Sequence, residues 1–369
     1  YVVGRWVRVR DPGGTERGTW RVEAVEGVDL VLEVGATVVE GDTWEGVYRF
    51  DAVSVTGSAR LHSADPISAP VLEMTSGGQL TGAPPEGVVD VTLGTADRYA
   101  TVWTPVTASG SIEIVGLSNA IDLSAPVISV RSGATLSHPS AQSLSLTADS
   151  VVIEDGASIN ATARGYADAQ TYPGEVLASY STSGGSHLGE GGYQYGTPGS
   201  TYGSVTQPGE AGAGGTYTTY STRGGGVIRI EATTVDLQGT SSITADGGSN
   251  GNYTAGAGGS IWITADDISG TGVIRARGGA STDRGNGGGG AIAIEYTGSL
   301  STTVEASLSA ATQTAGSSLL GGAGTVYIRR PTSTHGELVV DNSGFNGRQT
   351  ILPALGSSVA QPGSGGTRI

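Results

Sequence analysis

The sequence predicts an all-β protein, and three observations support this: the apolar pattern, the glycine content and an internal repeat. Val, Ile, Thr and Tyr recur in runs of four to seven residues that are bounded by Gly, Asp, Asn and Ser, whereas helix-period apolar patterns are absent. Gly accounts for 63 of the 369 residues without the strict Gly-X-Y period of collagen, so we expect the glycines at turns and corners.

The internal repeat predicts how the strands are arranged. The stretch GGGVIRIEATTVDLQGTSSITADGG at 224–248 matches GGSIWITADDISGTGVIRARGG at 258–279 strand for strand. Further copies begin at residues 289 and 321, and the period stays between 31 and 34 residues. A repeat of this size cannot bury its own apolar face, so neighbouring copies must stack on one another. The sequence therefore predicts a parallel β-helix, or β-solenoid.

Alignment of the four copies predicts which side chains point into the core. Because side chains alternate along a strand, two columns are expected to face inward and two outward. The inward columns are Ile228, Ile261, Ile292 and Val326, and Ile230, Ile263, Ile294 and Ile328. The outward columns are Arg229, Trp262, Ala293 and Tyr327, and Glu231, Thr264, Glu295 and Arg329. In-register pairing would bring Glu295 to Arg329 and Trp262 to Arg229.

The chain divides into five segments by pattern and composition. Residues 1–48 are typical of antiparallel hairpins with turns at 12–14 and 26–27, and predict a small β module or N-terminal cap. The first solenoid part covers 49–165, a Gly/Tyr-rich insertion covers 166–223, the second solenoid part covers 224–345, and a C-terminal strand or linker covers 346–369.

Composition excludes several classes of partner. The net charge is −15 and all 19 basic residues are Arg, so we expect no binding to nucleic acid, which requires clustered cations. No apolar run approaches the 18 residues of a membrane span, so no membrane insertion is expected. The absence of Cys removes disulfides and thiolate chemistry.

Residue patterns for catalysis or metal binding are weak, and no catalytic residue, metal ligand or cofactor is assigned. Asp266-Asp267 is the only Asp pair, and we interpret it as a corner. The four His residues are scattered without zinc-site spacing. GGAGTVYIR at 321–329 approaches the calcium-binding β-roll repeat but carries Thr325 in place of Asp, which leaves calcium without a supporting motif.

The insertion holds 8 of the 14 Tyr residues among Gly, Ser and Pro. Two interpretations stay open: the tyrosines clamp the insertion onto the solenoid, or they stack on sugars or on another protein. Deleting 168–221 is expected to leave a folded solenoid that has lost binding. The candidate partner-binding residues are Tyr193, Tyr195, Tyr202, Tyr217 and Tyr220, with Trp262, Tyr327 and Arg229 as a secondary surface.

The repeated GGG-V-I-R-I-E-A and GG-S-I-W-I-T-A units resemble those of large, glycine-rich, repetitive bacterial cell-surface proteins with parallel β-helix regions. The resemblance covers about residues 49–345 and implies export and an adhesive or structural role. We therefore expect a non-enzymatic, extracellular segment that spans distance and presents a surface to a glycan, to a cell-surface protein or to further copies in a filament. The alternatives are a carbohydrate-active β-helix enzyme or tailspike-like module, and an ice-binding face.

Overall fold

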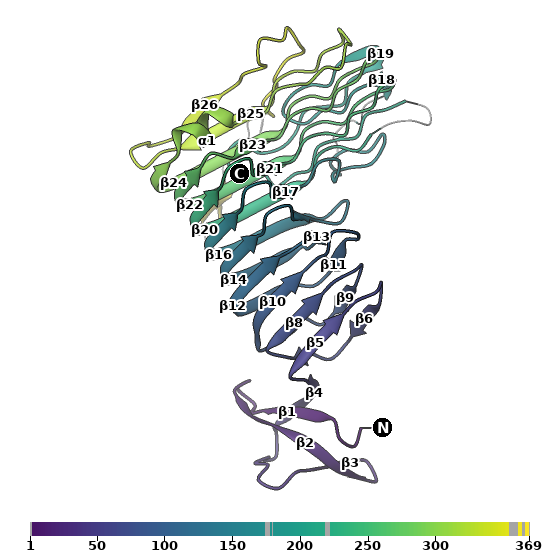
Figure 1. The fold of residues 1–369 in the computed structure, drawn as a ribbon, viewed down its shortest axis with the longest axis vertical. Coiled ribbons are helices and arrows are strands. Elements are labelled where there is room, and N and C mark those ends of the chain that lie inside the picture. The colour runs from purple at the N-terminus through teal and green to yellow at the C-terminus, as the bar shows by residue number, and fades with distance from the viewer. Residues whose placement is uncertain are drawn as a thin grey trace.

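The computed structural model describes residues 2–173, 178, 180–217, 222–353, 361–363 and 366–368. It is an all-β structure in which two parallel sheets, one of eleven and one of eight strands, form most of the molecule. Figure 1 shows them as a stack that rises from β5 near the N-terminal module to β25 at the opposite end. The six-residue helix α1 (Thr302–Ser307) was not expected, and it begins at Ser301, whose Oγ accepts a hydrogen bond from the Val304 N–H.

The N-terminal residues form a separate sheet, as predicted. Its first three strands pair as antiparallel hairpins around the two expected turns. The sheet extends beyond residue 48, because a short strand from further along the chain pairs with its edge in parallel. In sheet order, the strands are β3 (Asp29–Leu32), β2 (Glu16–Glu26), β1 (Trp6–Arg10), β4 (Thr43–Arg49) and β7 (Ile67–Ser68).

The chain then alternates between the two parallel sheets. The longer sheet contains β5 (Ala52–Val55), β8 (Val71–Met74), β10 (Val88–Leu93), β12 (Val106–Ile114), β14 (Asp122–Val130), β16 (Ser143–Ile153), β20 (Val227–Leu237), β22 (Ser260–Gly270), β24 (Ala291–Leu300), β25 (Thr325–Arg329) and the antiparallel β26 (Glu337–Val339). The shorter sheet contains β6 (Arg60–Ser63), β9 (Gln79–Gly82), β11 (Ala100–Val102), β13 (Leu117–Asn119), β15 (Thr135–Ser137), β17 (Ser158–Asn160), β21 (Ser242–Thr244) and β23 (Val273–Arg275).

The two predicted inward columns are confirmed. Ile228 pairs with Ile261, Ile261 with Ile292, and Ile292 with Val326, all in parallel register. The second column pairs in the same way, and every member of both columns is buried. These residues belong to one hydrophobic core that both parallel sheets share.

Several long strands, among them β14, β16, β20 and β22, bend in the middle, and this lets both halves face the same core. In β16, Leu144 and Leu146 are fully buried, and so are Val151 and Ile153. A straight strand presents every second residue to one face, so the change from even to odd positions requires a bend between the halves. The following short strand adds Ile159 to the same core. Residues of both sheets in each repeat therefore contribute to one core.

Glycine serves two different purposes. The turns from long to short strands contain glycines with positive φ, a conformation that side chains with a Cβ rarely adopt: Gly57, Gly77, Gly133, Gly156, Gly239 and Gly270. The glycine-rich segments after the short strands are different, because their glycines lack positive φ and instead allow very close backbone packing. A Cβ on Gly258 would lie 2.2 Å from the Ala276 carbonyl oxygen and 2.6 Å from the Gly290 nitrogen.

These glycine-rich segments form a hydrogen-bonded array, which we call the glycine array. In segment 255–259, N–H groups three residues apart donate to the same neighbouring segment. Ala255 and Gly258 donate to the carbonyls of Gly285 and Gly288, and Gly256 and Gly259 donate to those of Gly248 and Ala245. Ala257 donates to a third segment, at Ala213. Three residues per turn without internal hydrogen bonds is the geometry of a polyproline II helix. Figure 1 shows the array as side-by-side ribbons without arrows that run toward β18 and β19.

The insertion is part of this array. The Gly185 N–H donates to Ala255 and the Gly189 N–H to Gly289, while Gly288 donates back to the Gly185 carbonyl. A Cβ on Gly185 would lie 2.1 Å from the Ala213 carbonyl oxygen, so the segments interlock at van der Waals contact. The structure therefore gives no support to the expectation that 168–221 can be removed without disturbing the fold, because the insertion supplies backbone partners to the second set of repeats.

One detail of the expected outer surface is wrong, and another differs in form. Asp266 and Asp267 lie inside β22, between the inward-facing Ala265 and Ile268, so the expected corner is a change of direction within one strand. Ala293 and Tyr327 were expected at the surface but are 0% and 7% exposed. Ala293 lies between Trp262 and Tyr327 in the ladder, and these larger side chains cover it.

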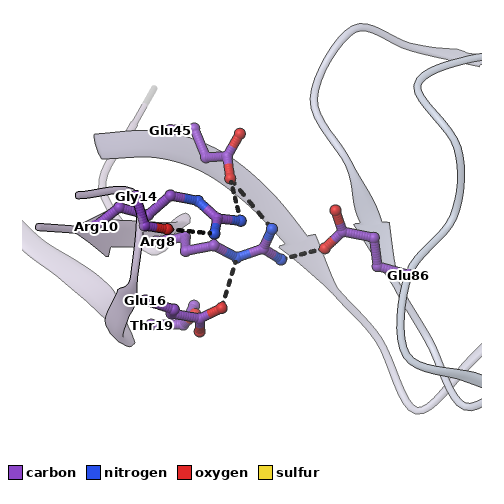
Figure 2. A network of polar contacts seen from close by, with 7 residues as sticks. All are labelled: Arg8, Arg10, Gly14, Glu16, Thr19, Glu45 and Glu86. Carbon is purple, nitrogen blue, oxygen red and sulfur yellow. Dashed lines mark hydrogen bonds and ion pairs between the residues drawn. The ribbon is translucent and has the colours of Figure 1, made fainter. Parts of the chain in front are cut away.

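The N-terminal sheet contacts the stack through buried and half-buried charges. The Arg8 guanidinium, whose residue is 8% exposed, donates to Glu86 and to Glu45 (3.1 Å), and its Nε lies 3.5 Å from Glu16. Figure 2 shows Arg8 reaching across to Glu86 from the N-terminal strands. The hydrogen bond to Glu86 raises the pKa of Arg8 further above its usual range. Glu86 is the partner that belongs to the stack, so its contact with Arg8 holds the module against the first repeats.

Replacing Ile261 tests the shared core. We expect Ile261→Ala to lower the free energy of unfolding by about 2–5 kcal/mol, because it removes buried methyl groups and leaves a cavity between two repeats. Guanidinium denaturation followed by circular dichroism measures the change. Thr264→Ala on the exposed side of the same strand is the control, and an equal effect of the two substitutions would contradict the proposed core position.

Replacing Gly258 tests the glycine array. We expect Gly258→Ala to destabilise the protein by about 1–3 kcal/mol or more, because the new methyl group overlaps two backbone atoms of neighbouring segments. Gly209→Ala is the matched control, since nothing lies within 4 Å of its Cβ position and its φ is not positive. Thermal melting of both variants gives the comparison, and a neutral Gly258→Ala would show that the segments are not closely packed.

Candidate functional site

The hairpin formed by β18 (Tyr180–Ser183) and β19 (Tyr193–Thr197) carries two of the predicted partner-binding residues, Tyr193 and Tyr195. The strands are antiparallel with an irregularity at Thr182, whose hydroxyl accepts from the Tyr195 N–H and donates to the Tyr195 carbonyl. Tyr195 is 66% exposed and Tyr180 is 71% exposed. The hairpin thus holds two large aromatic rings in solvent.

Sequence reasoning missed Tyr180 as a site residue. It lies in the same Tyr-rich insertion, but no local motif separates it from the other tyrosines. Pairing with Thr197 places it across the hairpin from β19, which carries Tyr195. The signal that could have found it is strand alternation on both sides of a Gly/Ser-rich connection, which is weak over so few residues.

Arginine side chains lie beside the aromatic and amide groups of the hairpin. The Arg348 guanidinium carbon is 3.9 Å from the centre of the Tyr193 ring. On the next residue along the strand, the side-chain amide oxygen of Gln194 accepts a hydrogen bond from the Arg284 guanidinium. Arg284 also lies 5.5 Å from the Tyr217 ring, which packs against Tyr253 at 5.1 Å. Tyr217, another predicted site residue, therefore connects the hairpin to the adjoining segments.

Tyr202 is a predicted site residue that the structure places in the interior. It is 4% exposed, its hydroxyl donates to the Ala211 carbonyl at 2.7 Å, and its ring lies 5.0 Å from the ring of His187. Burial raises the pKa of the Tyr202 hydroxyl well above its ordinary value and lowers the pKa of His187. Tyr202 therefore clamps the insertion, which is one of the two roles considered for these tyrosines. Tyr220 lies outside the described residues.

The secondary surface is only partly formed. Arg229 lies 4.5 Å above the Trp262 ring, as predicted, and also pairs with Glu231 at 3.3 Å. The Glu295–Arg329 pair is likewise present, at 3.2 Å. Tyr327 is not available to a partner in this structure, because it is buried and its hydroxyl donates to the carbonyl of His335, in the turn before β26.

The acidic side chains of β22 bind within the protein. Asp266 accepts a hydrogen bond from the Thr297 hydroxyl, and Asp267 accepts from the Ser299 N–H at 2.8 Å and from its hydroxyl at 2.6 Å. Both carboxylates are thereby tied to β24, the next strand of the sheet. In the described part of the chain, no group of three His, Asp or Glu residues is arranged to hold a metal ion.

His138 connects the repeat before the insertion to the one after it. Its Nε2 accepts a hydrogen bond from the Val227 N–H at 3.2 Å, so Nδ1 carries the proton and donates to the Pro139 carbonyl at 2.9 Å. The residue is fully buried, and burial lowers its pKa to about 4. A Cβ on Gly226 would lie 2.2 Å from Nε2, so the imidazole packs directly on the glycine array.

No protein-family model, curated protein or solved structure matches this chain. Within the described residues, no helix is long and apolar enough to cross a membrane.

Acid should destabilise the fold through His138. Imidazole in the unfolded chain titrates near pH 6.5, whereas the pKa of His138 in the folded chain is about 4. Above about pH 6.5 the imidazole is neutral in both states, so His138 does not reduce the free energy of unfolding there. As the pH falls from 6.5 toward 4, only the unfolded chain gains the proton, and the free energy of unfolding decreases by about 1.4 kcal/mol per pH unit.

Urea denaturation at intervals between pH 7.5 and 5 measures this slope, and His138→Gln should reduce it. Glutamine keeps a side-chain acceptor but does not titrate. The exposed His62→Gln is the control and should keep the original slope. A slope that His138→Gln leaves unchanged would assign the acid sensitivity to other groups.

Proposed function

We propose that this chain is a non-enzymatic structural and adhesive segment of a larger bacterial surface protein, built as a β-solenoid that spans distance and presents a binding surface. The observation that carries the proposal is the uninterrupted stack of ten parallel strands in the longer sheet. At about 4.8 Å between strands, the nine steps of this stack extend roughly 43 Å. Such a stack is a rigid spacer that needs no chemistry of its own.

Several features support the solenoid as the form of this stack. The chain alternates between the two parallel sheets, a single core receives side chains from both, and the register continues across the insertion from β16 to β20. Solenoids need covered ends, because open strand edges pair with other chains. Here the N-terminal sheet contacts the first repeats, and antiparallel β26 lies on β25.

The glycine array favours a load-bearing role. A β-sheet is crosslinked along one direction only, whereas segments of the array donate in three directions around their axis. Separation of one segment therefore breaks hydrogen bonds to several others. Its position beside the solenoid also gives the insertion a firm base, from which the hairpin tyrosines face solvent.

Export and cell-surface location form part of the same proposal, and they are supported by the resemblance to glycine-rich surface proteins together with the acidic, Lys-free composition. The partner is a glycan, a cell-surface protein or a second copy of the chain. A net charge of −15 disfavours nucleic acid and other polyanions through repulsion.

The alternatives receive less support. For a carbohydrate-active enzyme, Asp266 and Asp267 would have to converge on a substrate, but both are held by the neighbouring strand. For an ice-binding face, outward threonines should repeat along a ladder. The aligned outward ladder instead runs Thr107, Ser124, Thr147, Glu231 and Thr264, where a charge interrupts the hydroxyls.

Beads that carry the full chain test the adhesive role. We expect them to be retained under flow on at least one of four surfaces: bacterial cells, protein-coated glass, immobilised glycans, or a layer of the same chain. In parallel, neutral and acidic polysaccharides incubated with the chain should yield no new reducing ends. Retention on none of the four surfaces would contradict the proposal, and cleavage abolished by Asp266→Asn or Asp267→Asn would establish the enzyme instead.

A further inference from the structure

The strands of the hairpin expose aromatic rings and no aliphatic side chain. Among the described residues of the insertion, the exposed large apolar side chains are all tyrosines: Tyr172, Tyr180 and Tyr195. The N-terminal module is different, since its exposed side chains include Val28 at 96% and Val34 at 97% as well as Trp44. The exposed surfaces of the hairpin and of this module therefore have different chemistry.

A guanidinium group lies beside one ring of the hairpin. Arg348 stacks on Tyr193 at 3.9 Å, and Tyr193 lies two residues before Tyr195 in β19. Arg348 is exposed and forms no ion pair with any carboxylate of the described residues, so its outer N–H groups can bind solvent or a ligand. Exposed ring faces with hydroxyl and guanidinium donors nearby suit a ligand that alternates apolar and hydroxylated surfaces.

Hydrogen bonds at the base of the hairpin also hold its two strands in place. The Ser183 hydroxyl donates to the Tyr180 carbonyl at 2.9 Å, and Gly184 and Gly192, which directly continue the two sides of the hairpin, are joined by an N–H to carbonyl bond of 2.8 Å. The Gly192 carbonyl accepts that bond, while its N–H donates into the glycine array at Asn286, also at 2.8 Å. A site that is already ordered loses little conformational entropy when a ligand binds.

We propose that the β18–β19 hairpin, through Tyr180 and Tyr195, binds a neutral glycan by stacking on the faces of its sugar rings. A tyrosine ring offers an apolar face for the C–H groups of a pyranose and a hydroxyl for its hydroxyls, at a small cost in side-chain entropy. This inference rests on the proposed adhesive function and names its ligand class.

The apolar surface and the charge of the hairpin both favour a neutral sugar over the other partners. Protein interfaces have apolar cores in which water is excluded, and the hairpin has no exposed aliphatic side chain with which to build one. Neither strand of the hairpin carries a charged residue, and the net charge of −15 on the chain as a whole opposes glycans rich in carboxylate or sulfate. A neutral oligosaccharide meets neither obstacle.

A printed array of neutral and acidic oligosaccharides tests the inference with the full chain, followed by calorimetric titration of the strongest binder. We expect binding to neutral glycans, and we expect Tyr180→Ala with Tyr195→Ala to weaken it at least tenfold, with unchanged thermal melting. The double Phe variant keeps both rings and should retain most of the affinity. Trp44→Ala, which removes a 62% exposed ring from the N-terminal sheet, is the matched control and should have no effect.

Each contrary result has a distinct meaning. Binding restricted to acidic glycans, or neutral-glycan binding that survives the double Ala variant, would overturn the inference. Beads retained only by protein-coated glass or by the same chain would also overturn it while leaving the adhesive function intact. Beads retained on none of the surfaces would remove the proposed function itself.

Discussion

Consecutive repeats are held together by apolar side chains that stack from one repeat to the next. One repeat brings few side chains to the core: from β20 and β21 they are Ile228, Ile230, Val235, Leu237 and Ile243. Such a set cannot exclude water alone, but each residue is covered when a copy lies on either side. The parallel register and the bends within several long strands follow from this requirement.

Backbone packing at glycine is a second constraint and extends the structure sideways. The glycines of the array lack positive φ, so their role is to let backbones approach to distances that a Cβ forbids. This explains why the insertion has so many glycines and why it belongs to the fold. Residues such as Gly185 and Gly189 must fit between segments that come from repeats about seventy to a hundred residues later in the chain.

Aromatic residues of similar sequence context have opposite roles in the structure. Tyr202 packs on His187 in the interior, and Tyr327 is covered by the turn before β26, whereas Tyr180 and Tyr195 remain in solvent. The hydroxyls of the two buried tyrosines donate hydrogen bonds to backbone carbonyls, because a buried hydroxyl without a partner would destabilise the fold. The exposed pair has no such structural task, and this makes the hairpin the part of the insertion best suited to meet a partner.

The repeat, its register and the two inward columns could be predicted from the sequence, because burial of one face imposes a side-chain period that can be recognised along the chain. The sequence also indicated the antiparallel N-terminal module and the Arg229–Trp262 contact. The folded structure was needed to show which tyrosines are exposed, that Asp266 and Asp267 lie within a bent strand, and that the insertion joins the glycine array. Glycine has no side chain, so the partners of each array segment are selected by backbone hydrogen bonds between distant segments, and the spacing of the glycines does not indicate which segments meet.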